Sequence, residues 1–185
     1  MQISPQNTSA AALWRYNAAL LAQAAAMVTR LGAEADAGFV YSRAVGPHLR
    51  HIIEHYLALV NALASRDRCV CYDARDRDPR IQTDPAATLA ALKQLTDSFA
   101  ALAQEKNLDL QTPLLTRLLA GARGEIELTV DTSLGRELLF LSSHTVHHFA
   151  LLGEYCRTAG VELGHDFGKA PATMAFEQLH TATSA

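Results

Sequence analysis

Three histidines lie within five positions of the segment LSSHTVHHFALLGEY, residues 141–155, whose other side chains are mostly apolar. His144 and His148 are four residues apart, so in a helix they lie one turn apart on the same face, while His147 is rotated toward the edge of that face. A buried imidazole is costly without a partner. Two imidazoles at this spacing can bind one divalent metal ion, and the spacing therefore points to a metal site.

A second segment, GPHLRHIIEHY at residues 46–56, places His48, His51 and His55 at positions i, i+3 and i+7, again on one helical face. Six of the eight histidines thus occupy two faces. If these faces meet, the pair from 141–155 and one imidazole of the second segment form a three-histidine site with open positions for water or substrate. The spacing leaves open which of the three supplies that imidazole, and ordinary packing or solvated histidines are the alternative.

Two glutamates accompany the histidines, since Glu137 lies two turns before the pair and Glu54 lies within the second cluster. Metal-bound imidazoles usually donate their other N–H to a carboxylate or carbonyl, so either glutamate could be an alternative ligand, orient a ligand or carry a proton. A solvated helix edge is the simpler interpretation of both. Arg50 and Arg136 could hold an anionic substrate. Position 145 is Thr where an H-E-x-x-H metalloprotease has glutamate, which disfavours peptide hydrolysis.

Four stretches with apolar residues at helical spacing predict the helices that would position these side chains. They cover residues 11–31, 46–64, 86–104 and 134–158, with a long crossover at 65–85 between the second and the third. Amphipathic helices bury their apolar stripes against one another, so we expect an all-α protein, a four-helix bundle formed by a single domain over residues 1–185.

Other segments carry weaker signals. Residues 69–72 and EIELTV at 125–130 have β-compatible patterns and predict a small two-stranded β element. Residues 105–124 are ambiguous. We expect residues 1–10 to be flexible and residues 161–185 to form an irregular C-terminal arm with about one helical turn.

Composition narrows the classes of function. The net charge is −3 and no dense Lys/Arg cluster occurs, so nucleic-acid binding is not expected. No stretch predicts a membrane span or an export signal. Cys69, Cys71 and Cys156 contain no C-x-x-C pair and suggest neither a disulfide framework nor a zinc knuckle, which favours a reducing cytoplasm.

The sequence resembles the DinB-like (DinB/YfiT) superfamily of metal-dependent bacterial proteins, in a subgroup without an assigned reaction. The resemblance is carried by VGPHLRHIIEHY at 45–56, CYDARDRD at 71–78, TSLGRELLFLSSHTVHHFALL at 132–152 and FGKAPAT at 167–173. It implies a four-helix bundle with a long link after the second helix. It also implies a metal triad of one histidine from the second helix and an H-x-x-x-H pair on the fourth. Matched by motif, that triad is His51, His144 and His148, with His48 and His55 as alternatives.

The resemblance further implies a homodimer and, in some relatives, transfer or isomerisation reactions that use a low-molecular-weight thiol. Our first hypothesis is therefore a metal-dependent enzyme that activates a thiol or water to act on a small molecule, as an S-transferase or hydrolase. Imidazole ligands suit zinc or nickel, and also iron or copper, so the sequence does not select the metal. The alternative is a non-catalytic metal- or ligand-binding protein of a stress response.

Overall fold

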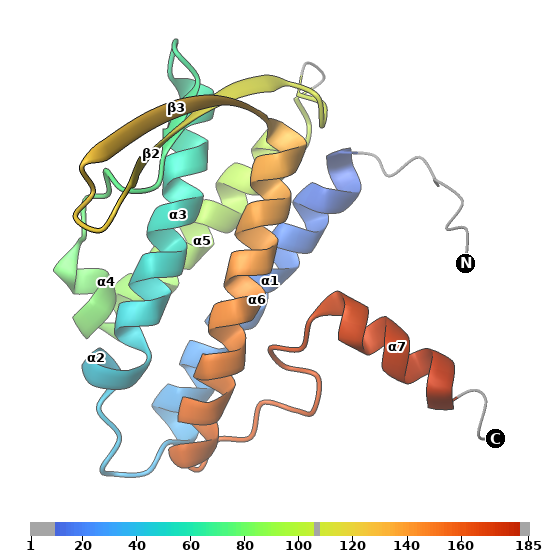
Figure 1. Cartoon of the computed structure of the whole chain (residues 1–185). Helices are drawn as coiled ribbons and strands as arrows, with labels where there is room; N and C mark the ends of the chain where they lie inside the picture. Colours follow the sequence, from blue (N-terminus) through green and yellow to red (C-terminus); the bar gives the residue numbers. More distant parts are fainter. Residues whose placement is uncertain (1–9, 106–107, 182–185) are drawn as a thin grey trace.

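Four long helices pack side by side in the computed structural model, which describes residues 10–105 and 108–181 (Figure 1). They are α1 (Ala10–Glu34), α3 (Gly46–Ala64), α5 (Pro85–Leu102) and α6 (Leu134–Thr158). The four predicted helices are confirmed, with boundaries within one turn. Each of α1 and α3 contacts both α5 and α6, and the shared core buries Trp14, Tyr56, Phe99 and Phe149. Within the described parts of the chain, no helix has both the length and the apolar character needed to cross a lipid bilayer.

Capping side chains explain where these helices begin. Asp84 accepts a hydrogen bond from the backbone N–H of Ala86 at 2.8 Å, ahead of α5. Ser133 accepts one from the backbone N–H of Arg136 at 3.3 Å, ahead of α6. Pro47 lies in the first turn of α3, where its missing N–H has no helical partner to lose. Because caps act locally, the sequence alone was enough to place these helix starts.

The all-α prediction is wrong, because a three-stranded mixed sheet lies across one end of the helices (Figure 1). The strands are β1 (Cys69–Cys71), β2 (Pro113–Ala120) and β3 (Ile126–Ser133). The central strand β2 pairs in parallel with β1 and antiparallel with β3. The predicted direct pairing of 69–72 with 125–130 is therefore also wrong. The sequence of β2 is PLLTRLLA, whose leucines favour a helix, and its two pairing neighbours override that weak local preference.

The connection between α3 and α5 is more ordered than a surface crossover. It contains β1 and α4 (Pro79–Thr83), and both contact α3. The buried hydroxyl of Thr88 on α5 donates to the carbonyl of Ile81 at 2.7 Å, which ties α4 to α5. A short helix, α2 (Tyr41–Ala44), precedes α3. The loop at residues 72–78 is thus held at both ends and runs beside α3.

The C-terminal arm is also more regular than predicted, because it contains the helix α7 (Pro171–Thr181). Phe167 anchors the arm to α6 by stacking on Phe149 with ring centroids 4.8 Å apart. Gly168 lies so close to α6 that a Cβ there would be 2.6 Å from the backbone nitrogen of Ala150. The prediction of flexible residues 1–10 falls outside the described residues, except for Ala10, which begins α1.

A buried polar network fixes the position of α3 along α6. The Tyr56 hydroxyl donates to Oδ1 of Asn17 at 2.8 Å. Oγ1 of Thr145 lies 3.2 Å from the Tyr56 hydroxyl and donates to the carbonyl of Leu141 at 2.7 Å. Asn17 Nδ2 in turn donates to the carbonyl of Leu138 at 3.2 Å. A slip of one helix along the other would leave these buried groups unpaired, at a cost of about 1–3 kcal/mol for each. The network therefore determines which side chains of α3 and α6 face each other.

We predict that Tyr56→Phe lowers the free energy of unfolding by about 1–3 kcal/mol, because Oδ1 of the buried Asn17 loses its donor. Urea unfolding followed by circular dichroism measures this change. Tyr155→Phe is the matched control, since that ring is 37% exposed, and its effect should stay within about 0.5 kcal/mol. Equal stability of the two variants would show that the network does not hold α3 against α6.

Candidate metal centre

The two histidine faces predicted from the sequence meet where α3 packs against α6, and their rings alternate along the contact. We call the set His48, His51, His55, His144 and His148 the histidine ladder. Its order is His55, His144, His51, His148 and His48, with successive ring centroids 4.7, 4.9, 4.9 and 5.2 Å apart. Along the ladder the residue numbers rise on α6 and fall on α3, because the two helices are antiparallel. Histidines about 90 residues apart in the chain therefore form one continuous group.

The closest nitrogens in the middle of the ladder belong to His51 and His144, whose Nε2 atoms are 2.9 Å apart. Two nitrogens that bind one zinc-like ion at about 2.0–2.1 Å lie about 3.0–3.4 Å from each other. The observed distance suits a hydrogen bond between a protonated and an unprotonated nitrogen, and a small adjustment suits two ligands of a shared ion. The donor set therefore fits a divalent transition metal.

His55 is oriented by its own helix. Its Nδ1 lies 2.7 Å from the carbonyl oxygen of His51, so Nδ1–H donates and Nε2 keeps its lone pair. One nitrogen each of His51, His55 and His144 can be chosen so that all three lie within 4.8 Å of one another. On the other side, Nδ1 of His148 lies 3.0 Å from Nδ1 of His48, so one of these two rings donates to the other.

The sequence predicted His51, His144 and His148 as ligands, with His48 and His55 as alternatives. The rings of this triad lie 4.6–4.9 Å apart, centroid to centroid. The grouping of ligand nitrogens includes His55 rather than His148. His51 and His144 belong both to the predicted triad and to the grouping of nitrogens. The two sets differ only in the third ligand, which is His148 in the triad and His55 in the grouping. The exposed side chain of His147 instead lines a separate groove on the outer side of α6.

Burial keeps the ladder in its neutral form. It lowers the pKa of His51 to about 3, with further lowering by His55 and by the guanidinium of Arg75. It also lowers the pKa of His144 to about 4 and that of His148 to about 4, and moves the pKa values of His48 and His55 downward. Neutral imidazoles have a lone pair to offer, so near pH 7 the ladder is in the protonation state that metal binding requires.

The two glutamates do not donate to or accept from a ladder imidazole. Fully buried Glu137 accepts hydrogen bonds from Tyr72 and Thr132, both at 2.6 Å, and from Arg136 at 3.0 Å. Tyr72 stacks on His55 with ring centroids 5.1 Å apart, so Glu137 positions a ligand candidate only through this tyrosine. Burial and the carboxylate of Glu137 raise the pKa of Tyr72. Its hydroxyl therefore stays protonated and donates to Glu137.

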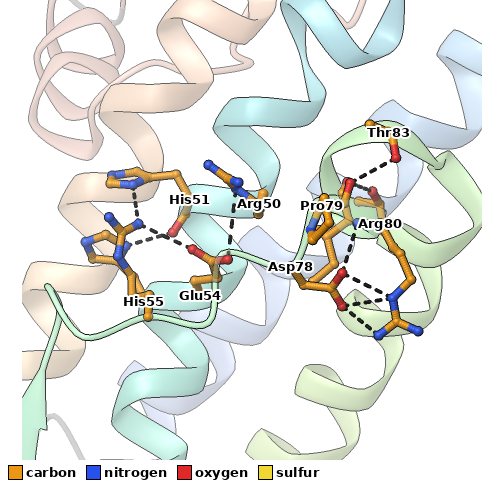
Figure 2. Close-up of polar contacts among 11 residues, drawn as sticks. Arg50, His51, Glu54, His55, Asp78, Pro79, Arg80 and Thr83 are labelled. Carbon is orange, nitrogen blue, oxygen red and sulfur yellow. Dashed lines mark hydrogen bonds and ion pairs between the residues drawn. The ribbon is translucent and has the colours of Figure 1, made fainter.

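Glu54 faces two arginines rather than an imidazole. Its carboxylate oxygens lie 3.6 Å from Nη1 of Arg75 and 3.9 Å from Nε of Arg50. Nη1 of Arg75 also lies 2.6 Å from Nδ1 of His51. Figure 2 shows Arg50, His51, Glu54 and His55 along α3, and Asp78 and Arg80 beyond them at α4. Arg75 and Tyr72 were not among the predicted site residues, because both lie in the crossover, where alternating charges are typical of a solvated loop.

A cavity of 360 Å³ lies beside the ladder, between the sheet and α6. Its wall includes His55, Tyr72, Phe140 and Arg136, and also the carboxylates of Asp73 and Asp131. The guanidinium of Arg136 lies 5.2 Å from the centre of the Phe140 ring, and that ring stacks on His144 at 5.5 Å. The cavity thus extends from the His55 end of the ladder to charged side chains of both signs.

A second, surface cluster consists of His165, Asp166 and Glu177. The ammonium of Lys169 lies within 3.0 Å of both His165 and Glu177, so a cation already occupies its centre. Of the three free cysteines, Cys69 and Cys71 lie half-buried on β1 and Cys156 is buried on α6. None belongs to either cluster.

Comparisons with known proteins give one distant likeness. A segment of 103 residues, 56% of the chain, is 29% identical to FK506-binding protein 5 of Rhizopus delemar. The chain spans about a quarter of the length of that protein, since 26% of it is covered. No protein-family model matches the chain, and no solved structure matches it.

We predict that the metal-free protein loses stability as the pH falls from about 6.5 toward 4. The folded-state pKa values of His51, His144 and His148 lie below the usual value near 6.5, so in this range the unfolded chain binds more protons. Melting temperatures of chelator-treated protein across this range measure the loss. When His51 and His144 are both replaced by Gln, the melting temperature should depend less on pH. The same change at exposed His180 is the control. A double variant as pH-sensitive as the parent would contradict this assignment.

Proposed function

We propose that this protein is a metal-dependent enzyme whose histidine ladder binds a divalent transition metal and leaves positions open to a small-molecule reactant. The observation that carries the proposal is the contact between Nε2 of His51 and Nε2 of His144, 2.9 Å apart, from two different helices. If this were only a chance pair of packed histidines, there would be no reason for the three other imidazoles of the ladder to lie in continuous contact with it. Zinc and nickel are the first candidates for the metal, followed by iron.

The bound ion would supply Lewis acidity, which lowers the pKa of a thiol or water so that a nucleophile exists near neutral pH. His51 and His144 would hold it, together with His55 or His148. The hydrogen bond from Nδ1 of His55 to the carbonyl of His51 orients the ring and leaves Nε2 as the nitrogen with a lone pair. On the other side, His48 can orient His148 through the contact between their Nδ1 atoms.

The cavity beside His55 is the proposed substrate site. Phe140 and Tyr72 provide apolar walls. The charged side chains in the wall are Arg136, which is paired with Glu137 at 3.0 Å, and the carboxylates of Asp73 and Asp131. Glu137 holds Tyr72 and Arg136 by hydrogen bonds at 2.6 and 3.0 Å, so the pocket wall is fixed before substrate binds. A low-molecular-weight thiol is the reactant that we propose, and hydrolysis by an activated water is the second choice.

The proposal retains three further expectations from the sequence. We place the enzyme in the cytoplasm, where the free cysteines would stay reduced. We expect a homodimer, as the family resemblance implies. We do not expect nucleic acid among its partners, given a net charge of −3.

We predict that tag-free, chelator-treated protein binds one cobalt(II) or zinc ion in the ladder. His51→Ala and His144→Ala should each weaken binding by about a hundredfold or more, because each removes a ligand. Comparison of His55→Ala with His148→Ala identifies the third ligand. His165→Ala is the control, since it disrupts only the surface cluster. Binding that survives loss of both His51 and His144 would contradict the proposed site.

Adding thiols to the same cobalt-loaded protein distinguishes the proposed enzyme from the alternative, a metal-binding protein that catalyses no reaction. Mercaptoacetate, which carries both a thiol and a carboxylate, should shift the visible spectrum by entering an open position. Mercaptoethanol, which lacks the carboxylate, should produce the same kind of shift, because the thiol rather than the carboxylate enters the open position. A spectrum that neither thiol changes would contradict thiol activation and favour the non-catalytic alternative.

A further inference from the structure

Arg75 reaches the histidine ladder from the loop at residues 72–78 and donates a hydrogen bond to His51. Its Nη1 lies 2.6 Å from Nδ1 of the imidazole, and its side chain is 16% exposed. A guanidinium has donors and no acceptor, so Nδ1 of His51 must be the acceptor. The neutral ring then carries its proton on Nε2, which donates to Nε2 of His144 at 2.9 Å. Arg75 therefore selects one tautomer of His51.

This tautomer is incompatible with a metal ligand at Nε2. Coordination requires the lone pair of Nε2, and the ring proton must then lie on Nδ1. That proton would point at the N–H of Arg75, so two donors would oppose each other with no acceptor between them. The guanidinium would also repel a cation held by the same ring. The hydrogen bond from Arg75 and coordination through Nε2 of His51 thus exclude each other.

Glu54 offers the guanidinium an alternative partner. Its carboxylate is on a residue only 4% exposed, and neither oxygen has a hydrogen-bond partner. Oε2 lies 3.6 Å from Nη1 of Arg75, close enough for an ion pair but too long for a hydrogen bond. A cavity of 140 Å³ lined by both side chains gives the guanidinium room to move. In Figure 2 the Glu54 carboxylate lies next to His51 on α3.

We propose that Arg75 is a gate on the metal centre. In the metal-free protein it holds His51 in the tautomer that cannot bind an ion through Nε2, and on metal loading it moves to Glu54, whose carboxylate gains the hydrogen bonds that it lacks. The inference rests on the proposed metal-binding function and adds the regulation of that site. It assigns Arg75 and Glu54 as positioning residues rather than ligands.

Cobalt(II) titration of chelator-treated protein tests the gate, with His165→Ala as the parent so that the surface cluster does not contribute. Arg75→Met should bind cobalt at least about tenfold more tightly than the parent, because the competing charge-assisted hydrogen bond is gone. Glu54→Gln should bind more weakly, and most of this effect should vanish when Arg75→Met is also present. Arg80→Met is the matched control, since Arg80 pairs with Asp78 at 2.7 Å outside the ladder, and its affinity should equal that of the parent.

Nitrogen-15 spectra of the imidazoles provide a readout that does not depend on metal. In the metal-free parent His51 should be protonated on Nε2, and Arg75→Met should release it from this single tautomer. A proton on Nδ1 of His51 in the parent would overturn the gate. Equal or weaker cobalt binding by Arg75→Met would also overturn it, while leaving the proposed metal centre in place. If neither protein binds cobalt, the proposed function fails and the gate fails with it.

Discussion

The packing of α3 against α6 at one fixed position determines both the core and the histidine ladder. Tyr56, Asn17 and Thr145 form hydrogen bonds at the centre of this contact, where no water can replace them. Because a helix repeats about every 3.6 residues, fixing one pair of side chains fixes those one turn away. The histidine ladder lies on the same two helices, so the network that stabilises the core also brings His51 to His144. The stability of the fold and the geometry of the site therefore have one origin.

Charge balance around the ladder follows from burial. The imidazoles are neutral because their environment disfavours their charged forms, and neutral imidazole is the form that binds metals. The positive charge of Arg75 at one edge of the ladder is offset by Glu54 rather than by an imidazole. The fold thus places the guanidinium of Arg75, Nδ1 of His51 and the carboxylate of Glu54 within reach of one another. Whether Arg75 donates to His51 or to Glu54 decides which nitrogen of His51 is free. The crossover, which supplies Arg75 and Tyr72, contributes to the site as much as the helices do.

The sequence predicted those parts that depend on local chemistry. Helix starts follow from caps such as Asp84 and Ser133, and the shared faces of the histidines follow from their spacing. The sheet was largely missed, because β2 is leucine-rich and becomes a strand only through partners distant in the sequence. Arg75 was missed for a similar reason, since its position is set by the contacts of β1 and α4 with α3. Glu137 was singled out, but its partner Tyr72 comes from a segment 65 residues away, and spacing within a helix gives no information about that contact.

In the proposed metal centre, His51 and His144 bind one ion through Nε2 from two different helices. Cadmium-113 and nitrogen-15 labelling tests it directly, because one-bond coupling between the two nuclei identifies each nitrogen that binds the metal. We expect a single cadmium ion to couple to Nε2 of both His51 and His144, and to one further ladder imidazole. Cadmium coupled only to His165, or coupled to no histidine of the ladder, would contradict it.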